Sequence, residues 1–435
     1  MTSVAGASIA PGIQFRPSPL IFCILAALVL IAYAPALTQP LLEDDYSNIV
    51  QARVYGPVSG WPEMFHDPVF RLRTTSWLLL NGLYQLAGMH ASAYYAVVIL
   101  LHVLNTWLVY AMGAWRALGY DVTAWAAGFF AVYEGHQEAV MWVSASNEEL
   151  MLLFGLLSLL AWVRFIESPR PLLYLASVAA FCLALVSKES AVIFLPLLVL
   201  PVAFDRKVRP KTTYLLPHAA LVILAAFSIV GTRSFSFRFH DGSFSLHAPF
   251  WLILPDNFAR LLWFWGLLSL SAISIWRPSG WRRILGIGVA WMAIGLVPYG
   301  FLTYSLRIPS RQLYLASVGL CVVVGFALLN LYRRYWLRRR GAVIAVCGLV
   351  ICANVLYLWT KKRDQYLERA APTEQIVALA RRTRGPIYVR CFPRPPLIAE
   401  SAIRLMTGRP ASDLIWNPEE AASRRTAATF CYPGR

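Results

Sequence analysis

The sequence predicts an all-α polytopic membrane protein with about eleven spanning helices and a small α/β appendage at its C-terminal end. Of its 435 residues, 58% are hydrophobic and only 14% are charged, whereas a soluble domain averages about 25% charged residues. Apolar runs of about 20 residues, the length that crosses the hydrocarbon core of a bilayer, recur along the chain. These runs lack the period-two alternation of a β-barrel. We therefore expect lipid to be the solvent of most of the chain.

Eleven apolar runs are the predicted spans, of which the third, fifth and sixth are short. The first could also be a secretory signal peptide, because Ala34-Pro35-Ala36 loosely fits a cleavage site. Since Arg16 is the only charge before this run, and the run exceeds a usual signal core, we expect a retained span. The predicted spans cover residues 18–39, 92–114, 122–135, 148–166, 172–187, 189–204, 213–231, 256–276, 283–302, 312–331 and 341–360.

The positive charge of the chain predicts its orientation. The chain has 39 Lys and Arg against 22 Asp and Glu, a net charge of +17, which in a soluble protein would suggest a nucleic-acid partner. Here the basic residues gather in short alternating loops, which the positive-inside rule assigns to the cytoplasm, so we expect no nucleic acid. The loops contain Arg206, Lys207, Arg209 and Lys211; Arg277, Arg282 and Arg283; and Arg333, Arg334, Arg338, Arg339 and Arg340.

This orientation places the N-terminus in the cytoplasm and the tail outside, because eleven is an odd number of spans. The short loops and the arginine-rich basic residues favour a bacterial inner membrane. The predicted division is a transmembrane domain over residues 1–360 and a small extracytoplasmic domain over residues 361–435. Within the tail, residues 364–382 have a helical pattern and residues 386–391 have a strand-like pattern.

Two of the seven cysteines, Cys391 and Cys431, lie in the exported tail. An oxidising compartment permits a disulfide between them, and free thiols remain the alternative. The other five fall in predicted spans, where they are expected to pack as small hydrophobic residues.

The acids before residue 361 are unevenly divided between the two sides. Acids contribute little to topology, so their excess outside indicates a site there that uses carboxylates. Only Asp121, Glu167 and Asp205 are predicted inside. Those at or near the outer face are Glu43, Asp44, Asp45, Glu63, Asp67, Glu134, Glu138, Glu148, Glu149, Glu189, Asp241 and Asp256.

The first outer loop contains three adjacent acids, Glu43, Asp44 and Asp45, directly after the first span. Adjacent carboxylates raise the cost of ionisation, which predicts a cation or a functional role; a solvated helix cap is the alternative. Further along, Phe70-Arg71 precedes the apolar stretch 77–87. That stretch is too short to span and is predicted to lie in the membrane interface.

The second outer loop carries His136 and Glu138. On a helix His136 shares a face with Val140, and Glu138 with Trp142, so a carboxylate and an imidazole could enter one cavity. Two such residues are not a zinc signature by themselves. The alternative, a histidine whose hydrogen bonds are made within the protein core, is equally consistent with the sequence.

Two further outer positions carry basic residues. Lys188-Glu189 lies at a membrane boundary, where ionisable residues usually pair or line a polar cavity; a snorkelling lysine paired with its neighbour is the alternative. Arg307 and Arg311 also lie near the outer interface. A guanidinium matches a phosphate bidentately, which predicts an anionic partner, with lipid headgroups as the alternative.

Taken together, these loops resemble the GT-C glycosyltransferases, particularly the protein O-mannosyltransferase branch and its tetratricopeptide-linked transmembrane relatives. The motifs follow the order, spacing and topology of this family over roughly residues 20 to 330. The sequence departs from the family in three ways: it has Arg71-Leu72 where the family usually has Arg-Pro, it has Ser144-Ala145-Ser146 where the family usually has Ser-Gly-Arg, and it lacks the tetratricopeptide repeats. These departures bear on the identity of the acceptor more than on the type of reaction. The matching features are Asp44-Asp45, Phe70-Arg71, the run from His136 to Ser144, Lys188-Glu189, and Arg311-x-x-Tyr-Leu.

The resemblance implies transfer of a sugar, mannose or another hexose or pentose, from a polyprenyl-phosphate carrier to a protein, lipid or glycan acceptor on the outer side. It implies that Asp44 or Asp45 is the general base, with Asp44 favoured, and that Glu138 is a second acid. An inverting displacement is expected, because one base faces a phosphate leaving from the other side. Paired acids could also hold Mg²⁺ or Mn²⁺, although the mannosyltransferase branch is thought to work without a cation. The residues implied to bind the donor phosphate are Arg71, His136, Lys188 and Arg311.

Two other functions compete with this hypothesis. A transporter or flippase of a lipid-linked saccharide should place its charges near the bilayer midplane and often shows two matching halves. Here the charges lie at the outer boundary and the sequence shows no internal repeat. A membrane-bound acyl- or phosphotransferase would also use histidines and acids, but it predicts no polyprenyl cavity. The glycosyltransferase hypothesis is therefore favoured.

Overall fold

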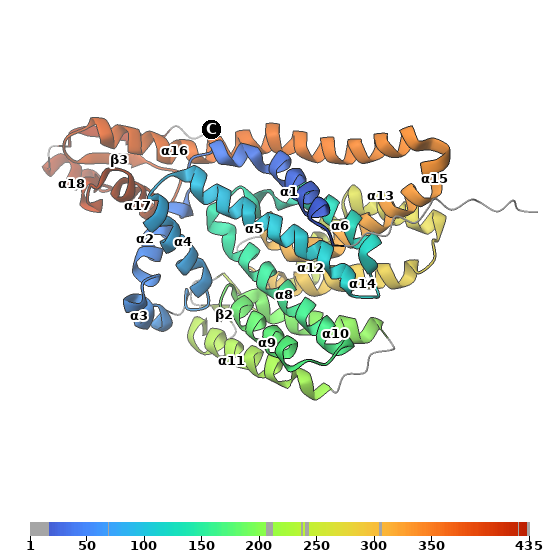
Figure 1. The fold of residues 1–435 in the computed structure, drawn as a ribbon. Coiled ribbons are helices and arrows are strands. Elements are labelled where there is room, and N and C mark those ends of the chain that lie inside the picture. Colours follow the sequence, from blue (N-terminus) through green and yellow to red (C-terminus); the bar gives the residue numbers. More distant parts are fainter. Residues whose placement is uncertain are drawn as a thin grey trace, which may run out of the picture.

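The computed structural model describes residues 17–432 except residues 68, 206–211, 236–237, 240–242, 304–306 and 425. Helices make up most of this part of the chain (Figure 1). Arg16, Arg206, Lys207, Arg209, Lys211 and Asp241 lie outside the described residues.

The predicted spans are all found as apolar helices. The third, fifth and sixth are short, as expected, with 14, 15 and 11 residues. The bundle consists of α1 (Pro19–Tyr33), α5 (Ala91–Ala111), α6 (Gly119–Val132), α8 (Ser146–Glu167), α9 (Pro171–Leu185), α10 (Phe194–Phe204), α11 (Leu216–Arg233), α12 (Phe250–Leu262), α13 (Trp265–Trp276), α14 (Trp281–Leu296) and α15 (Tyr314–Tyr357).

Helix length gives a smaller number of spans than the sequence predicts. In the described part of the chain, five helices are long and apolar enough to cross a membrane, and the bent pair α12 and α13 makes a sixth if it is one span. This pair bends by 73°, next to Phe264, whose φ of 61° is unusual for a residue with a side chain. The total of eleven stays a prediction.

Helix α15 contains two of the predicted spans, because the chain reverses within it. Ser317 contacts His136, and Asn354 accepts a hydrogen bond from the backbone N–H of Glu134 (3.0 Å). A straight helix would separate Ser317 from Asn354 by roughly 55 Å at about 1.5 Å per residue, so both cannot reach neighbouring residues without a turn. The turn lies at Arg339, whose φ and ψ of −143° and 51° are not helical.

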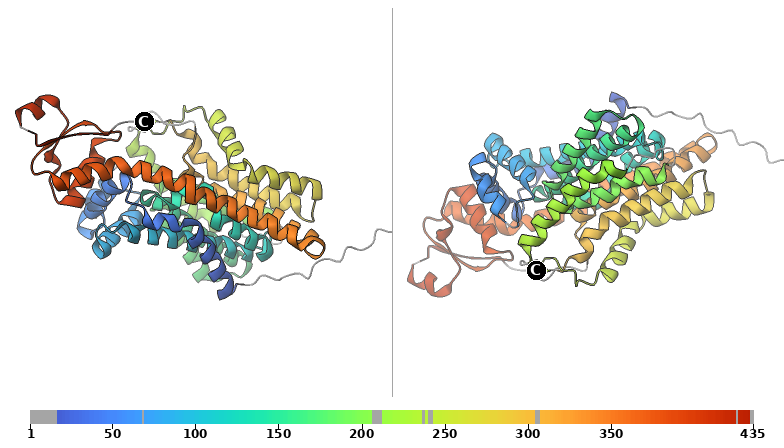
Figure 2. Two further views of the ribbon diagram at one scale, coloured as in Figure 1. Left: turned by 90° about the horizontal axis from the view of Figure 1, so that it is seen from above. Right: turned by 90° about the horizontal axis from the view of Figure 1, so that it is seen from below.

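Figures 1 and 2 show this turn at the end of the bundle that is remote from the C-terminal strands. Two ion pairs join the predicted cytoplasmic segments at that end: Arg333 with Asp121, and Arg116 with Glu167 (3.0 Å). The segments predicted on one side therefore meet at one end of the molecule. Which end faces the cytoplasm stays a prediction from charge.

The first half of α15 is the centre of the bundle, and its side chains are buried from Tyr314 to Ala327. Small residues let the neighbouring helices approach closely. A Cβ on Gly319 would collide with the backbone of Gly288 in α14, and one on Gly325 would collide with the backbone of Ala126 in α6. In a membrane the hydrophobic effect does not drive helices together, so they associate through close packing at small residues.

Shorter helices cover the end of the bundle at which the acids gather. They are α2 (Asp44–Tyr55), α3 (Trp61–His66), α4 (Thr74–Ala87) and α7 (Gln137–Val140). Helix α4 contains the stretch predicted to lie in the interface. It buries Trp77, Leu80 and Leu83 and exposes Leu78 and Leu86, the helical spacing of an amphipathic segment.

The C-terminal residues form the predicted small α/β unit. Its parallel sheet has the strand order β4-β3-β5, and the predicted boundary at residue 360 falls in the π-helical turn Leu358–Lys362 that joins α15 to α16. The unit comprises α16 (Arg363–Arg382), β3 (Ile387–Cys391), α17 (Pro396–Thr407), β4 (Leu414–Ile415), α18 (Pro418–Ser423) and β5 (Ala428–Cys431). Elsewhere, β1 (Ser234–Phe235) pairs antiparallel with β2 (Arg238–Phe239).

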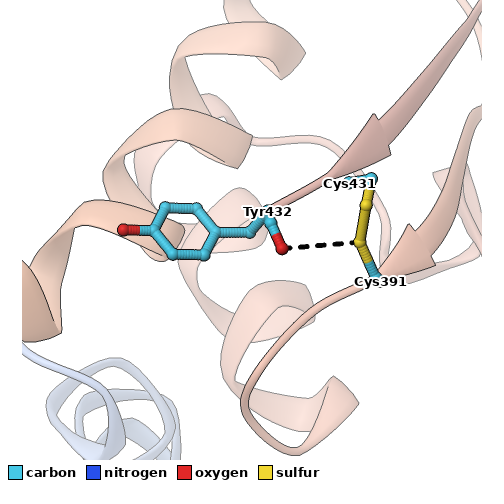
Figure 3. The surroundings of a disulfide bond; sticks show 3 residues. All are labelled: Cys391, Cys431 and Tyr432. Atoms are coloured by element: carbon cyan, nitrogen blue, oxygen red, sulfur yellow. Dashed lines mark hydrogen bonds between the residues drawn. A yellow bond between two sulfur atoms is a disulfide. The ribbon is translucent and has the colours of Figure 1, made fainter. Parts of the chain in front are cut away.

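A disulfide between Cys391 and Cys431 joins the neighbouring strands β3 and β5 (Figure 3). Of the two states that the sequence leaves open for these cysteines, the structure has the disulfide. Helix α17 packs against α2, and Tyr46 of α2 donates a hydrogen bond to Glu374 of α16 (3.1 Å). The C-terminal unit thus lies against the end of the bundle that carries the acids.

Candidate active site

Two groups of charged residues lie at this end of the bundle. The Asp44 cluster comprises Glu43, Asp44, Asp45, Glu138, Arg311, Arg369 and Arg394, with Trp142 and Ser144. The Lys188 cluster comprises Arg73, Glu148, Lys188, Glu189 and Tyr299. The two clusters share no residue, although the resemblance implies that Lys188 of one and Arg311 of the other bind the same donor phosphate.

Asp45 connects the first outer loop to the second. Its Oδ1 accepts hydrogen bonds from the N–H (2.7 Å) and hydroxyl (2.5 Å) of Ser144, and its Oδ2 accepts one from the N–H of Leu42 (2.8 Å). Burial raises the pKa of Asp45 to about 7, although these hydrogen bonds favour the ionised form. Because the side chain is buried and both oxygens are occupied, Asp45 fits a role in holding the loops together better than the role of a base.

Asp44 is the one exposed carboxylate of the three adjacent acids. It is the first residue of α2, at the positive end of that helix. Desolvation and the neighbouring Glu43 raise the pKa of Asp44, while the positive charges of Arg311, Arg369 and Arg394 lower it. An accessible carboxylate with a raised pKa is what general-base catalysis requires.

Glu43 is buried and binds two arginines of the C-terminal unit. Arg369 donates from Nε and Nη2 to its two carboxylate oxygens (3.1 and 2.7 Å), and Arg394 lies 2.5 Å from Oε1. The φ of Glu43 is 38°, in the region that residues with side chains rarely adopt. Sequence reasoning missed both arginines, because they lie more than three hundred residues away along the chain and in no recognisable motif.

Glu138 and Arg311 contact each other, although they lie in loops that are far apart in the sequence. The backbone N–H of Arg311 donates to Glu138 Oε2 (3.1 Å), and its guanidinium lies 3.8 Å from the same oxygen. The guanidinium of Arg311 also lies 4.7 Å from the ring centre of Trp142, and that of Arg369 lies 4.6 Å from it. Two cations, from α16 and from the segment that leads into α15, thus gather at one aromatic ring.

His136 does not face this cluster. Its side chain is fully buried, with Nδ1 3.1 Å from the carbonyl oxygen of Phe130 and Nε2 2.6 Å from the hydroxyl of Ser317. Desolvation lowers the pKa of this imidazole, which favours its neutral form. Since both ring nitrogens are occupied, the expected donation to a phosphate does not fit, and His136 is the satisfied core histidine that the sequence left open.

Lys188 pairs with Glu148 of α8 and not with its neighbour Glu189. Glu148 also accepts a hydrogen bond from the hydroxyl of Tyr299 (3.2 Å), and both members of the pair are buried. Glu189 instead binds Arg73 (3.2 Å). The charge of Lys188 is therefore balanced within the protein, which disagrees with a direct role in binding phosphate.

Arg71 is also occupied by local contacts. Its guanidinium donates to the backbone carbonyls of Asp67 (3.1 Å) and His66 (3.4 Å) in its own loop. Arg73, two residues later, is the arginine of this loop that reaches the Lys188 cluster. The sequence pattern cannot separate these two arginines.

The acids do not form a site that fits Mg²⁺ or Mn²⁺. Such ions require several free oxygen ligands, but the oxygens of Asp45 are occupied and Glu43 is paired with two arginines. Among the described residues, no three His, Cys, Asp or Glu side chains are grouped so that they could hold a metal ion.

Comparison with known proteins agrees with this fold. Residues 74–231 match the family model described as dolichyl-phosphate-mannose-protein mannosyltransferase. This segment includes Glu138 and Lys188 but neither Asp44 nor Arg311. No curated protein matches the sequence significantly.

Two kinds of solved structure resemble the whole fold. ArnT from Cupriavidus metallidurans bound to undecaprenyl phosphate superposes with a TM-score of 0.51 and 14% identity, over 94% of this chain and 88% of that one. The oligosaccharyltransferase AglB from Archaeoglobus fulgidus, in complex with an inhibitory peptide and a dolichol-phosphate, superposes with a TM-score of 0.50 and 10% identity. This match covers 92% of the present chain, which spans only 64% of AglB.

Both structures are GT-C glycosyltransferases, and the family model covers part of the same bundle. The resemblance to the GT-C superfamily that the loop motifs indicate is therefore confirmed at the level of the fold. The chain is an integral membrane protein with the GT-C glycosyltransferase fold.

Proposed function

We propose that this protein transfers a sugar from a polyprenyl-phosphate carrier to an acceptor on the outer side of the membrane, with Asp44 as the general base. One observation carries the proposal. Of three adjacent acids, Asp44 alone is exposed, and it lies within the influence of three guanidinium groups, Arg311, Arg369 and Arg394. Sugar transfer requires a base that removes the proton of the acceptor hydroxyl, and cations nearby that stabilise the negative charge of the departing phosphate.

Asp44 takes the proton of an acceptor hydroxyl, whose oxygen forms a bond to C1 of the sugar. The bond from C1 to the phosphate oxygen breaks, and its electron pair stays with the polyprenyl phosphate. Attack in line with the leaving phosphate inverts the configuration at C1. The raised pKa of Asp44 makes it a stronger base than an ordinary aspartate.

Arg311 is the residue proposed to bind the leaving phosphate. Its guanidinium is partly exposed and is held by a long contact of 3.8 Å to Glu138. A phosphate could displace this contact at little cost, because long exposed ion pairs contribute little to stability. Glu138 then orients Arg311 and the acceptor. Arg71, His136 and Lys188 bind no phosphate in this proposal, since each is occupied by protein groups.

The donor class is supported by the two similar structures, which are complexes with dolichol-phosphate and with undecaprenyl phosphate. The sugar would be a hexose or a pentose, and the acceptor a protein, lipid or glycan. The membrane would be the bacterial inner membrane, with the Asp44 cluster on its outer face, as the positive-inside rule indicates.

Transfer by the Asp44→Asn variant tests the base. Wild-type protein and variant are reconstituted in liposomes with a radiolabelled polyprenyl-phosphate sugar and membrane-derived acceptors, and label in products is measured. We expect the variant to lose about 10²- to 10⁴-fold in rate, the usual contribution of a general base. Glu63→Gln, which alters another exposed outer acid, is the control and should keep full activity.

Unchanged transfer by Asp44→Asn would reject the base assignment. If the wild-type protein moves the lipid-linked sugar across the bilayer without transferring it, the proposed reaction is wrong and a flippase is supported instead.

A further inference from the structure

Glu43 has a backbone conformation that its own sequence does not explain. Its φ of 38° and ψ of −112° lie outside the regions open to ordinary residues, and its side chain forms no cap for α2. Such conformations persist only where surrounding contacts hold them, and they gather at functional sites. The residue that follows is Asp44, so whatever holds Glu43 also orients the proposed base.

The contacts that hold Glu43 come from the C-terminal unit. Arg369 of α16 binds both carboxylate oxygens as a fork, and Arg394, between β3 and α17, binds one of them. On the other side of Asp44, the buried Asp45 is bound by Ser144 and Leu42. Asp44 therefore lies between two neighbours whose positions are each held by distant parts of the chain.

We propose that Glu43, Arg369 and Arg394 form a clamp through which the C-terminal unit positions Asp44. The three are positioning residues, and the inference rests on the proposed function of Asp44. The clamp explains why the unit lies over this end of the bundle: without it, the strained turn before α2 relaxes and the carboxylate loses its orientation. A misplacement of about 1 Å can lower a rate about 100-fold.

Arg369 is assigned to the clamp rather than to the donor phosphate because of its contacts. Its Nε and Nη2 are occupied by Glu43, and its guanidinium lies 4.6 Å from the ring centre of Trp142 and 5.2 Å from that of Tyr366. Among the described residues, Arg311 has no comparable short ion pair, and its one ion pair is the 3.8 Å contact to Glu138. A phosphate would therefore bind Arg311 before it could displace Glu43 from Arg369.

Hydrogen exchange tests the clamp without any assumption about the substrate. Wild-type protein, Arg369→Ala and Arg369→Lys are compared in lipid nanodiscs by mass spectrometry. We expect peptides covering residues 42–50 to exchange about tenfold faster in Arg369→Ala, because local opening becomes easier there, and peptides of α8 to be unchanged. Arg369→Lys, which keeps the charge but loses the fork, should fall between. Arg382→Ala, at an exposed position of the same helix, is the control.

Equal exchange at the start of α2 in wild type and Arg369→Ala overturns the clamp, whatever reaction the protein catalyses. Arg369→Lys keeps this test valid if the alanine variant does not fold.

Kinetics then separate positioning from phosphate binding. Glu43→Ala and Arg369→Ala should each lower kcat about 10- to 100-fold and leave the KM for the donor within about twofold. The double variant should be no slower than the slower single variant, because both changes remove one contact.

A KM that rises about tenfold in Arg369→Ala with kcat unchanged, together with a harmless Glu43→Ala, would assign Arg369 to the phosphate and overturn the clamp. If the wild-type protein transfers no sugar, the proposed function fails, while the exchange experiment still decides whether the clamp exists.

Discussion

The Asp44 cluster and the Lys188 cluster contain similar residues but differ in how their charges are satisfied. In the Lys188 cluster, the lysine and Glu148 are both buried and paired directly. In the Asp44 cluster, one carboxylate is exposed, and the one ion pair of the nearby Arg311 with a described residue is a long contact of 3.8 Å to Glu138. A buried, fully paired charge is expensive to disturb, whereas a loosely held charge at an accessible position is available to a ligand. The difference indicates a structural role for the Lys188 cluster and a chemical role for the Asp44 cluster.

The largest effect is expected from breaking the Lys188 pair. Glu148→Ala leaves a buried lysine without its partner, which should lower the free energy of unfolding by about 3–5 kcal/mol. Thermal unfolding in detergent measures this. The double variant Glu148→Leu with Lys188→Met should recover most of the loss, because it removes both charges. A stable but inactive Glu148→Ala protein would instead move the chemistry to the Lys188 cluster.

The next effect concerns the disulfide of the C-terminal unit. Two arginines of this unit belong to the Asp44 cluster. Cys431→Ser opens a cross-link whose loss typically costs about 2–4 kcal/mol. We expect α16 and α17 to become sensitive to limited proteolysis and transfer to fall, while the bundle stays intact. Cys182→Ser, at an exposed free cysteine of α9, is the control. Equal protease resistance in both variants would show that the unit does not need its cross-link.

A smaller effect is expected from Arg311→Ala. Loss of a charged hydrogen-bonding partner to the phosphate should lower kcat/KM about tenfold to a hundredfold, with little change in unfolding temperature. Arg71→Ala, in a loop where the guanidinium binds backbone carbonyls, is the comparison and should change kcat/KM much less. The reverse order of the two variants would restore Arg71 as the phosphate ligand.

The smallest effect is a shift in the pH profile. The base must be ionised, so activity falls as the pH is lowered through the pKa of Asp44. Partial desolvation by the surrounding protein and the charge of Glu43 raise this pKa, so the acid limb of kcat/KM should lie above the ordinary range of aspartate. Arg311, Arg369 and Arg394 oppose that rise, so Arg311→Ala should move the limb to higher pH. A limb that stays in place would mean that another group titrates.

Loop motifs predict much of the candidate site, but not its pairings. Glu138 and Arg311 come from two separate segments and contact each other, and the charge of Arg311 acts on Asp44. That these three residues form the catalytic site stays a prediction. Lys188 was expected to pair with its neighbour if it were structural, and it binds Glu148 instead. Partner choice depends on which helices pack side by side, and no local pattern contains that information.

The sequence by itself determined where the apolar helices lie, which residues could carry chemistry and that the tail forms a small α/β unit with two cysteines. Lipid selects spanning segments by local composition, which can be followed along the chain. Tertiary structure alone decided that Asp44 is exposed and Asp45 buried, that His136 belongs to the core, and that arginines of the tail bind Glu43. Burial and ion pairing depend on distances between segments far apart in the chain, and these distances exist only once the bundle has packed.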